Sequence, residues 1–201
     1  MPIAVASTTV RIVAASSNDC TTSFADVPLS PASSSDAFLV AAFAQGNGGP
    51  QATAFVDELT TTGATNTRLR LIAAAFTGAG SGGNTTAPVD LYVAGGVATP
   101  SIFDDVPFGG IAPGPATVDA NGYLSRDAFV HADLRVRLHA SLDLLDDSGF
   151  STTAAHVYSF FTVGVHSLLP GNATPMRLLA CDDTAAPVGH LGVCTTSGTE
   201  L

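Results

Sequence analysis

The chain has 201 residues, of which 46% are hydrophobic and 12% are charged, a length that suits one large or two small domains with a real core. Its 7 basic residues are all arginine and stand against 17 acidic residues, giving a formal net charge of −10. Such a surface repels phosphate backbones, so the composition argues against nucleic-acid binding. No window approaches the ~20 uninterrupted apolar residues of a membrane helix, and we predict no membrane span.

The composition also bears on the compartment. Absence of lysine with abundant Ala and Gly indicates the codon bias of a GC-rich bacterial genome. Abundant Ser and Thr, Gly-rich turns and weak charge favour a surface exposed outside the cell over a halophilic one, which usually carries far more acids. Met1–Val5 shows no signal-peptide pattern. The chain is therefore either cytoplasmic or an excerpt of a longer precursor. We expect the excerpt, with an extracellular or cell-surface location.

The predicted elements are strands, because short alternating or apolar segments are broken by Gly, Pro, Asn and Asp. Thr9–Val13 alternates, with Arg11 expected to face outward. Arg68–Leu71 and Arg135–Leu138 repeat this design. We therefore expect the guanidinium groups of all three segments on the wet face and the branched aliphatic side chains on the core face.

Further strands and turns follow along the chain, and their spacing of roughly 8–12 residues predicts an all-β, antiparallel β-sandwich of the Ig-like or Greek-key type. The turn signals are rich in Gly, Asn and Pro. The strands are predicted at Ala37–Ala44, Thr53–Glu58, Val89–Val93, Ile102–Phe103, Ala128–His131, His156–Val165 and Met176–Cys181, and the turns at Gly46–Pro50, Gly78–Asn84, Ala94–Gly96, Ala120–Gly122 and Pro170–Asn172.

One strand-rich unit occurs twice, displaced by about 125 residues. Three blocks match in one register with a single one-residue gap, including a shared Gly-Asn-x-x-Pro turn. The alternative is that any two β-rich stretches can be aligned. The matching blocks are Val10–Ala14 with Val136–Ala140, Gly46–Pro50 with Gly171–Pro175, and Val56–Glu58 with Cys181–Asp183.

The repeat predicts three parts: a partial β-sandwich repeat at 1–64 (the second half of a copy), a complete repeat at 65–185, and a C-terminal tail at 186–201. Half a sandwich exposes an unpaired sheet edge and an uncovered apolar face, which is unstable alone. The partial copy must therefore pack on the complete one, or borrow its missing half from sequence upstream or from another chain.

Three motifs give the chain a family resemblance, at Leu71–Ala74, Pro88–Val93 and Phe103–Gly109. In these it resembles the bacterial domain of unknown function 4397. That family's pattern runs from an Arg-Val-rich strand and a His-Ala-Ser-Pro loop, through a Val-Asp-Val-Tyr strand, to a Val-Pro-Phe-Gly turn and a Tyr-containing strand. Here Ala73–Phe76 replaces the loop. The resemblance covers 67–185 as a whole copy and 7–62 as a partial one.

The resemblance implies a β-sandwich in secreted or surface proteins, often in tandem, with no established activity to carry over. Within it, Val89 faces the core, Asp90 and Tyr92 face out or cap turns, and Gly109 permits a turn conformation closed to other residues. The motif residues with structural roles are Val89, Asp90, Tyr92, Pro107, Phe108, Gly109 and Tyr123.

The three cysteines predict one disulfide. A bond between Cys181 and Cys194 would staple the tail to the sandwich, which stabilises by about 3 kcal/mol in the chain-entropy model. Cys20 has no partner in the repeat, and its natural partner would lie in missing upstream sequence. No histidine is tied to a cysteine by a recognisable pattern, so a catalytic cysteine is not indicated.

Metal and phosphate signals are weak. Asp119, Asn121 and Asp127 hint at a calcium loop, but they lack the ligand ladder and terminal Glu of an EF-hand, so an Asx-type turn is favoured and calcium is the only cofactor kept open. The 5 histidines have no close metal-site spacing. Asp104-Asp105 and Asp146-Asp147 are expected to be solvated loop acids. Gly78–Gly83 fits G-x-G-x-x-G, but a strand follows it and not a helix.

No catalytic constellation is recognisable, so we predict no enzyme. The leading hypothesis is an extracellular or cell-surface module with a structural, adhesive or assembly role, associating with itself or with other proteins through an open sheet edge. The alternative is a ligand-binding module for carbohydrate (a glycan) or calcium, acting through loops at one end of the sandwich. It predicts exposed aromatic side chains there. The candidates are Phe76, Phe108, Tyr123 and Phe150.

Overall fold

The computed structural model describes residues 8–13, 23, 25–30, 37–43, 51–57, 63–80, 83–95, 101–111, 118–166, 174–184 and 193–201. The chain divides into two compact units, Met1–Glu58 and Leu59–Leu201, which we call the first and the second unit. The described residues form strands, turns and connections and no helix. They accordingly contain no helix with the length and apolarity needed to cross a bilayer.

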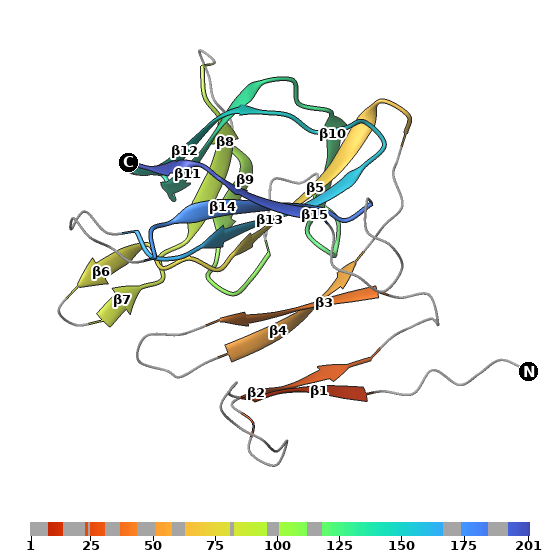
Figure 1. The fold of residues 1–201 in the computed structure, drawn as a ribbon, viewed down its shortest axis with the longest axis vertical. Coiled ribbons are helices and arrows are strands. Elements are labelled where there is room, and N and C mark those ends of the chain that lie inside the picture. Colours follow the sequence, from red (N-terminus) through yellow and green to blue (C-terminus); the bar gives the residue numbers. More distant parts are fainter. Residues whose placement is uncertain are drawn as a thin grey trace, which may run out of the picture. The chain divides into compact units, whose positions relative to one another are not determined.

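The first unit contains two antiparallel hairpins (Figure 1). β1 (Thr8–Ile12) pairs with β2 (Ala25–Leu29), and β3 (Ala37–Phe43) pairs with β4 (Gln51–Asp57). β2 also contacts β4, and each of these two strands carries a buried apolar side chain. The buried side chains are Val27 and Phe55, and the exposed ion pair between Arg11 Nε and Asp26 Oδ1 (3.0 Å) crosses from β1 to β2.

The described residues of the second unit form two five-stranded sheets and a small hairpin (Figure 1). Sheet I has the order β10-β5-β13-β14-β15, and sheet II has the order β16-β12-β11-β8-β9. The strands of sheet I are β5 (Asn66–Ala73), β10 (Tyr123–Asp127), β13 (Val157–Val163), β14 (Arg177–Asp182) and β15 (Val193–Ser197). Those of sheet II are β8 (Val89–Val93), β9 (Ser101–Val106), β11 (Ala132–Leu138), β12 (Asp143–Phe150) and β16 (Thr199–Glu200). β6 (Gly78–Gly80) and β7 (Gly83–Thr85) form the hairpin.

One hydrophobic core joins the two sheets. Leu69 and Phe160 of sheet I pack in the same fully buried cluster as Leu91 and Leu134 of sheet II. Burying each such side chain stabilises the fold by about 1.5–3 kcal/mol. The predicted all-β sandwich is therefore confirmed.

One strand pair departs from the antiparallel prediction, since β13 runs parallel to β5. The chain passes through β6 to β12 between these two strands, and a long connection of this kind permits a parallel pair where a tight hairpin does not.

Two sequence predictions about strands are wrong. Ala128–His131 is not a strand but the connection between β10 and β11, in which Val130 is 79% exposed and His131 has a φ of 49°. The expected loop acids lie in strands, Asp104 and Asp105 inside β9 and Asp146 and Asp147 inside β12, where Asp147 is buried. The nine other predicted strands overlap β1, β3, β4, β5, β8, β9, β11, β13 and β14.

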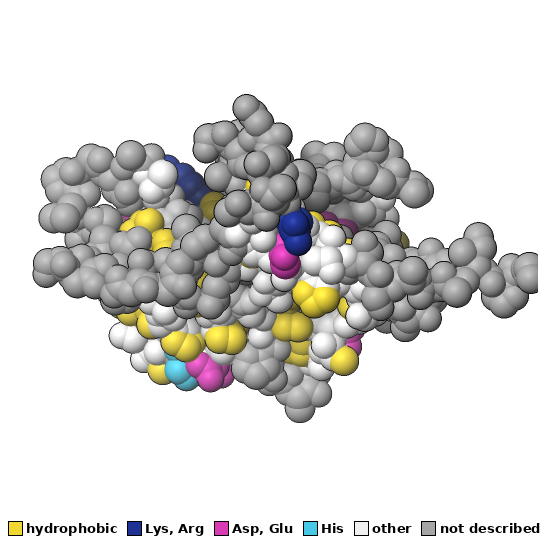
Figure 2. All heavy atoms as spheres, turned by 90° about the horizontal axis from the view of Figure 1, so that it is seen from below, with side chains coloured by type: hydrophobic (Ala, Val, Ile, Leu, Met, Phe, Trp, Pro, Cys, Tyr) yellow, Lys and Arg dark blue, Asp and Glu magenta, His cyan; other side chains and the backbone are white. Residues whose placement is uncertain are grey.

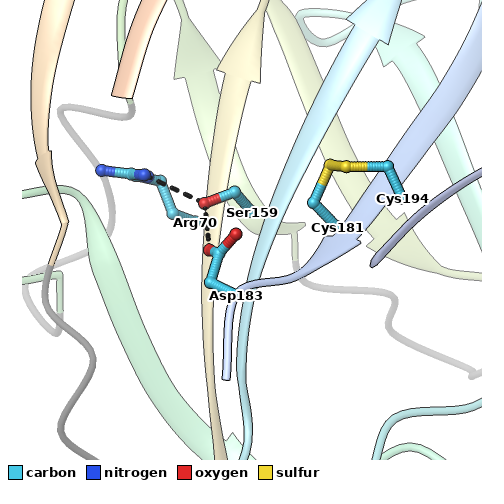
Figure 3. Close-up of a disulfide and its surroundings, with 5 residues drawn as sticks. All are labelled: Arg70, Ser159, Cys181, Asp183 and Cys194. Carbon is cyan, nitrogen blue, oxygen red and sulfur yellow. Dashed lines mark hydrogen bonds between the residues drawn. A yellow bond between two sulfur atoms is a disulfide. The ribbon is translucent and has the colours of Figure 1, made fainter. Parts of the chain in front are cut away.

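The prediction that Arg68 and Arg70 face solvent is also wrong. Arg68 is 8% exposed and Arg70 is 0% exposed, although both alternate correctly with core leucines along β5. Their guanidinium groups lie over the ring of Tyr123, at 5.1 Å and 4.5 Å from its centroid. Arg70 Nη2 also donates to Ser159 Oγ at 3.0 Å (Figure 3). The second face of β5 is thus covered, which alternation alone cannot reveal.

The predicted tail contains strands of both sheets, because β15 pairs with β14 and β16 pairs with β12. The predicted disulfide between Cys181 and Cys194 is present in the structure, between directly opposite residues of β14 and β15 (Figure 3). Cys20 and the repeated turns at Gly46–Pro50 and Gly171–Asn172 lie outside the described residues.

Candidate functional site

Among the residues that the structure describes, a group of ionisable side chains surrounds Asp90 on β8. β8 lies between β9 and β11 in sheet II, so its neighbours bring Asp104 and Asp105 from one side and Arg137 and His139 from the other. We call these five residues the Asp90 cluster. Asp90 is 0% exposed, whereas the side chains of His139 and Asp104 are 42% and 49% exposed.

Both carboxylate oxygens of Asp90 accept hydrogen bonds. Oδ1 accepts from the backbone N of Asp105 at 2.9 Å and from His139 Nδ1 at 2.8 Å. Oδ2 accepts from Arg137 Nε at 2.9 Å and from the backbone N of Ala140 at 3.3 Å. This buried charge is therefore paired and hydrogen-bonded, as a stable buried carboxylate requires.

The contacts of Asp90 shift two pKa values in opposite directions. Burial raises the pKa of Asp90, but the hydrogen bonds from Asp105, His139, Arg137 and Ala140 outweigh it and lower the pKa to about 2. The pKa of His139 is raised by its hydrogen bond to Asp90 and by the negative charges of Asp90, Asp105 and Asp104. The ionised forms of both groups stabilise each other.

The same group has the ligand types of a metal site. Ligand atoms of Asp90, Asp104 and His139 all lie within 4.8 Å of one another, and imidazole with carboxylates suits a transition metal better than calcium. No other group of three such residues occurs in the described part of the chain. Coordination by Asp90 would have to displace a hydrogen bond, because both of its oxygens already have protein donors.

A second layer extends the cluster across sheet II. The guanidinium group of Arg137 lies 4.9 Å from the ring centroid of Tyr92, and Tyr92 OH donates to Asp143 Oδ1 at 2.7 Å. Burial and this bonded carboxylate raise the pKa of Tyr92. Asp90 and Tyr92 were expected to face out or to cap turns. They are buried, and Asp90 caps the backbone N–H groups of Asp105 and Ala140.

The predicted calcium residues do not converge. Asp119 Oδ1 accepts from the backbone N of Asn121 at 2.9 Å and of Tyr123 at 3.0 Å, the geometry of an Asx-type turn, and Asp119 also pairs with Arg68. Asp127 lies at the other end of β10, about 13 Å further along at a rise of ~3.3 Å per residue. The favoured alternative, an Asx-type turn, is the one that the structure contains.

The four aromatic side chains considered for a glycan site are not exposed. Phe76 and Tyr123 are buried, and Phe108 and Phe150 are half-buried. Phe76 stacks on Phe108 with ring centroids 5.3 Å apart, and Phe150 packs against Phe160. These side chains pack the protein and present no aromatic platform to a sugar.

The Val106–Gly109 motif ties the sheets together. Gly109, at a φ of 71°, has the left-handed conformation that glycine permits. Its backbone N donates to Ala73 O of β5 at 2.7 Å, and Ala73 N donates to Gly110 O at 3.3 Å. Pro107 is exposed beside it. The turn after β9 therefore anchors an edge of sheet II to sheet I.

Four arginine side chains form ion pairs with aspartates of the same chain. Arg11, Arg68, Arg135 and Arg137 each form an ion pair with an aspartate, and in the middle of the face in Figure 2 a basic side chain lies directly against an acidic one. No sequence motif marks Arg137 and His139 as partners of Asp90. The available signal was their position at the end of the alternating segment that pairs with the Asp90 strand.

Comparison with protein-family models found no match to this chain. Searches of the curated proteins and of the solved structures likewise found no similar protein. The resemblance to the domain of unknown function 4397 therefore rests on the motifs of the sequence alone and stays a prediction.

Proposed function

We propose that the chain is a non-enzymatic extracellular or cell-surface β-sandwich module with a structural, adhesive or assembly role, and that it assembles through sheet edges of the first unit. The observation that carries this proposal is a repeated pairing pattern. β1 pairs with β2 as β11 pairs with β12, and β3 pairs with β4 as β13 pairs with β14. β2 also contacts β4 as β12 contacts β14.

The comparison identifies strands that have no counterpart among the described residues of the first unit. In the second unit β11 also pairs with β8, and β13 also pairs with β5. In the first unit no described strand occupies the corresponding edge of β1 or of β3. Exposed backbone N–H and C=O groups on such edges are a template for pairing with another chain. A second copy of the chain has strands that could pair with these edges.

Two further observations support a structural role outside the cytoplasm. The Cys181–Cys194 disulfide is the kind of bond that persists in oxidising compartments. The polar groups of the Asp90 cluster form hydrogen bonds with one another. Stabilisation of sheet II is therefore a sufficient role for these charged side chains. The family resemblance points the same way, since it implies secreted and surface proteins.

Sedimentation of the full chain over a concentration series tests the assembly. We expect the mean mass to rise with concentration. Thr9→Lys places a charge at an exposed position of β1, on whose second edge no described strand pairs, and should reduce the rise, whereas Thr153→Lys, an exposed position outside the strands of the second unit, should not. A strict monomer at the highest concentration, or equal effects of both substitutions, would sink the proposal.

The alternative, a ligand-binding module, has one specific observation in its favour: the ligand atoms of Asp90, Asp104 and His139. On this hypothesis the ligand is a divalent cation. Zinc or calcium should then raise the melting temperature of the full chain, and Asp104→Asn should abolish the rise. Melting curves unchanged by both ions would eliminate this candidate.

A further inference from the structure

The segment Val193–Leu201, which we name the clasp, closes one edge of both sheets. β15 pairs with β14 from Leu178↔Ser197 to Asp182↔Val193. β16 pairs with β12 through Leu145↔Glu200 and Asp146↔Thr199. Gly198, at a φ of 85°, turns the chain between the two strands. A single short segment thus provides the edge strand of sheet I and of sheet II.

The clasp is held by side-chain and backbone contacts to the same body. Its side-chain and terminal contacts reach residues from Leu144 to Cys181, and its strand pairing extends to Asp182, so the receiving surface belongs to one unit that every copy of the chain has. The contacts are the Cys181–Cys194 disulfide, Ser197 Oγ donating to Asp147 Oδ2 (2.6 Å), Arg177 Nη1 donating to Gly198 O (3.0 Å), His166 Nδ1 beside Glu200 Oε1 (3.1 Å) and Leu201 N donating to Leu144 O (3.1 Å).

Removing the clasp would leave two neighbouring edges open. The backbone groups of β14 and β12 that face it would lose their partners, and the buried carboxylate of Asp147 would lose the Ser197 hydroxyl. Open edges and an unpaired buried acid are costly. The exposed edges of β14 and β12 would therefore favour binding of a clasp, either from the same chain or from another copy.

We propose that the clasp is exchanged between two copies of the chain, so that β15 of each copy pairs with β14 of the other and the Cys181–Cys194 disulfide forms between them. The proposal rests on the assembly role inferred above. It names a second copy of the chain as the partner and the disulfide as the bond that controls the exchange. Exchange of an identical element is a low-cost route to a closed dimer, because both copies use the same surface. The clasp makes the same contacts in the closed monomer and in the exchanged dimer. The protein concentration therefore determines which of the two forms predominates.

The receiving surface is the second unit of the other copy and not the edge of β4 in its first unit. In the sequence repeat Val56 of β4 stands where Cys181 stands in β14. A clasp on β4 would therefore have no disulfide. Exchange between second units retains every contact of the clasp.

The disulfide controls the exchange. Cys194 is exposed, so a dithiol reductant can attack its sulfur, which forms a mixed disulfide and releases Cys181 as a thiol. The second thiol of the reductant then displaces Cys194. In balance, the dithiol is oxidised to a disulfide and transfers two electrons and two protons to the protein disulfide. Reoxidation after exchange seals the dimer.

An isotope-mixing experiment tests the exchange on the natural sequence. Uniformly ¹⁵N-labelled and unlabelled full chains are mixed, reduced with dithiothreitol, reoxidised with oxidised glutathione and digested without reduction. A protease that cleaves before aspartate separates Cys181 from Cys194 at Asp182 and Asp183. Mass spectrometry then shows whether the linked peptides carry the same label or different labels.

We expect mixed-label Cys181–Cys194 pairs whose share rises with the protein concentration during reoxidation, and label-matched pairs alone in a sample that was never reduced. Label-matched pairs at every concentration would overturn the proposal. Mixed labels spread equally over links to Cys20 would also overturn it, because they would indicate random disulfide formation.

A complementation experiment gives a second readout in a Cys20→Ser background. Chains with Cys181→Ser and chains with Cys194→Ser are oxidised together. Exchange predicts a covalent heterodimer well above the homodimers that either variant forms alone, and an equal yield contradicts it.

Sedimentation separates this proposal from the edge assembly. If the never-reduced chain assembles but labelled and unlabelled chains do not mix after reduction, the exchange is refuted and the edge assembly is supported. Mixing in a protein that is monomeric before reduction supports the exchange and refutes the edge assembly.

Discussion

At the scale of single residues, the protein depends on buried charges that are paired within the chain. Asp90 stands among core residues of β8, yet it carries a carboxylate that is ionised because two backbone N–H groups, Arg137 and His139 donate to it. A buried carboxylate with these partners fixes the positions of β9 and β11 relative to β8. Removing it would leave several donors without an acceptor.

The substitution Asp90→Asn tests this role. It keeps the size of the side chain but turns one acceptor oxygen into a donor that faces other donors, so we expect a loss of about 3 kcal/mol in the free energy of unfolding. Urea unfolding measures the loss. Asp104→Asn is the matched control, since its side chain is 49% exposed, and it should cost less than about 0.5 kcal/mol. Equal losses would contradict the role assigned to Asp90.

The Asp90–His139 contact makes stability depend on pH in two windows. The pKa of His139 is raised above 6.5, so its stabilisation is complete below pH 6.5 and is lost as the pH rises through the folded-state value. The pKa of Asp90 is lowered from 3.8 to about 2, so its stabilisation is present above pH 3.8 and is lost as the pH falls toward 2.

Urea midpoints across this pH range check the two windows. His139→Gln should remove the loss of stability above pH 6.5 that belongs to His139 and leave the acid window. His131→Gln, at an exposed histidine in the β10–β11 connection, serves as the control and should leave the alkaline slope unchanged. An alkaline slope that survives His139→Gln in full would show that another group carries it.

At the scale of elements, the clasp determines how both sheets end. Its turn depends on Gly198, where a Cβ atom would lie 2.6 Å from Leu145 Cδ2. Leu145 is fully buried, so its side chain would have to shift within the packed core to make room. The clasp thus has a steric requirement at its centre in addition to its disulfide.

Gly198→Ala tests that requirement against Gly149→Ala. Both glycines have positive φ, 85° and 76°, but a Cβ at Gly149 meets nothing within 4 Å. Backbone strain should destabilise both variants by about 1 kcal/mol, and overpacking against Leu145 should cost Gly198→Ala at least about 1 kcal/mol more. Urea unfolding measures the difference. Equal losses would mean that the clasp tolerates a side chain at its turn.

The sequence predicts some elements and misses others for physical reasons. Val89–Val93 is predicted with its exact bounds, because its core side chains alternate and turns flank it. β2 contains Pro28, β12 contains three acids and β16 has two residues, so none has a strand pattern of its own. These strands form because a neighbour pairs with them. Partners distant in the sequence also explain why the burial of Arg70 and Asp90 could not be predicted.

At the scale of the whole molecule, the pairing pattern of the first unit matches four strands of the second. Three short matching blocks of the sequence predict a repeat, which stays a prediction, with its first boundary between residues 64 and 65; the compact units divide between Glu58 and Leu59. The predicted location, the family and the assembly are proposals, because they depend on partners and on a compartment that no pattern in this chain specifies.

Hydrogen–deuterium exchange at low and high concentration tests the central claim, that a second copy pairs with the edges of β1 and β3 on which no described strand lies. We predict that the amides of these two strands become better protected as the concentration of the never-reduced chain rises. The amides of β8 and β11, which already pair within the second unit, should be unaffected and serve as the internal control. Protection of β1 and β3 that is the same at every concentration would contradict the account.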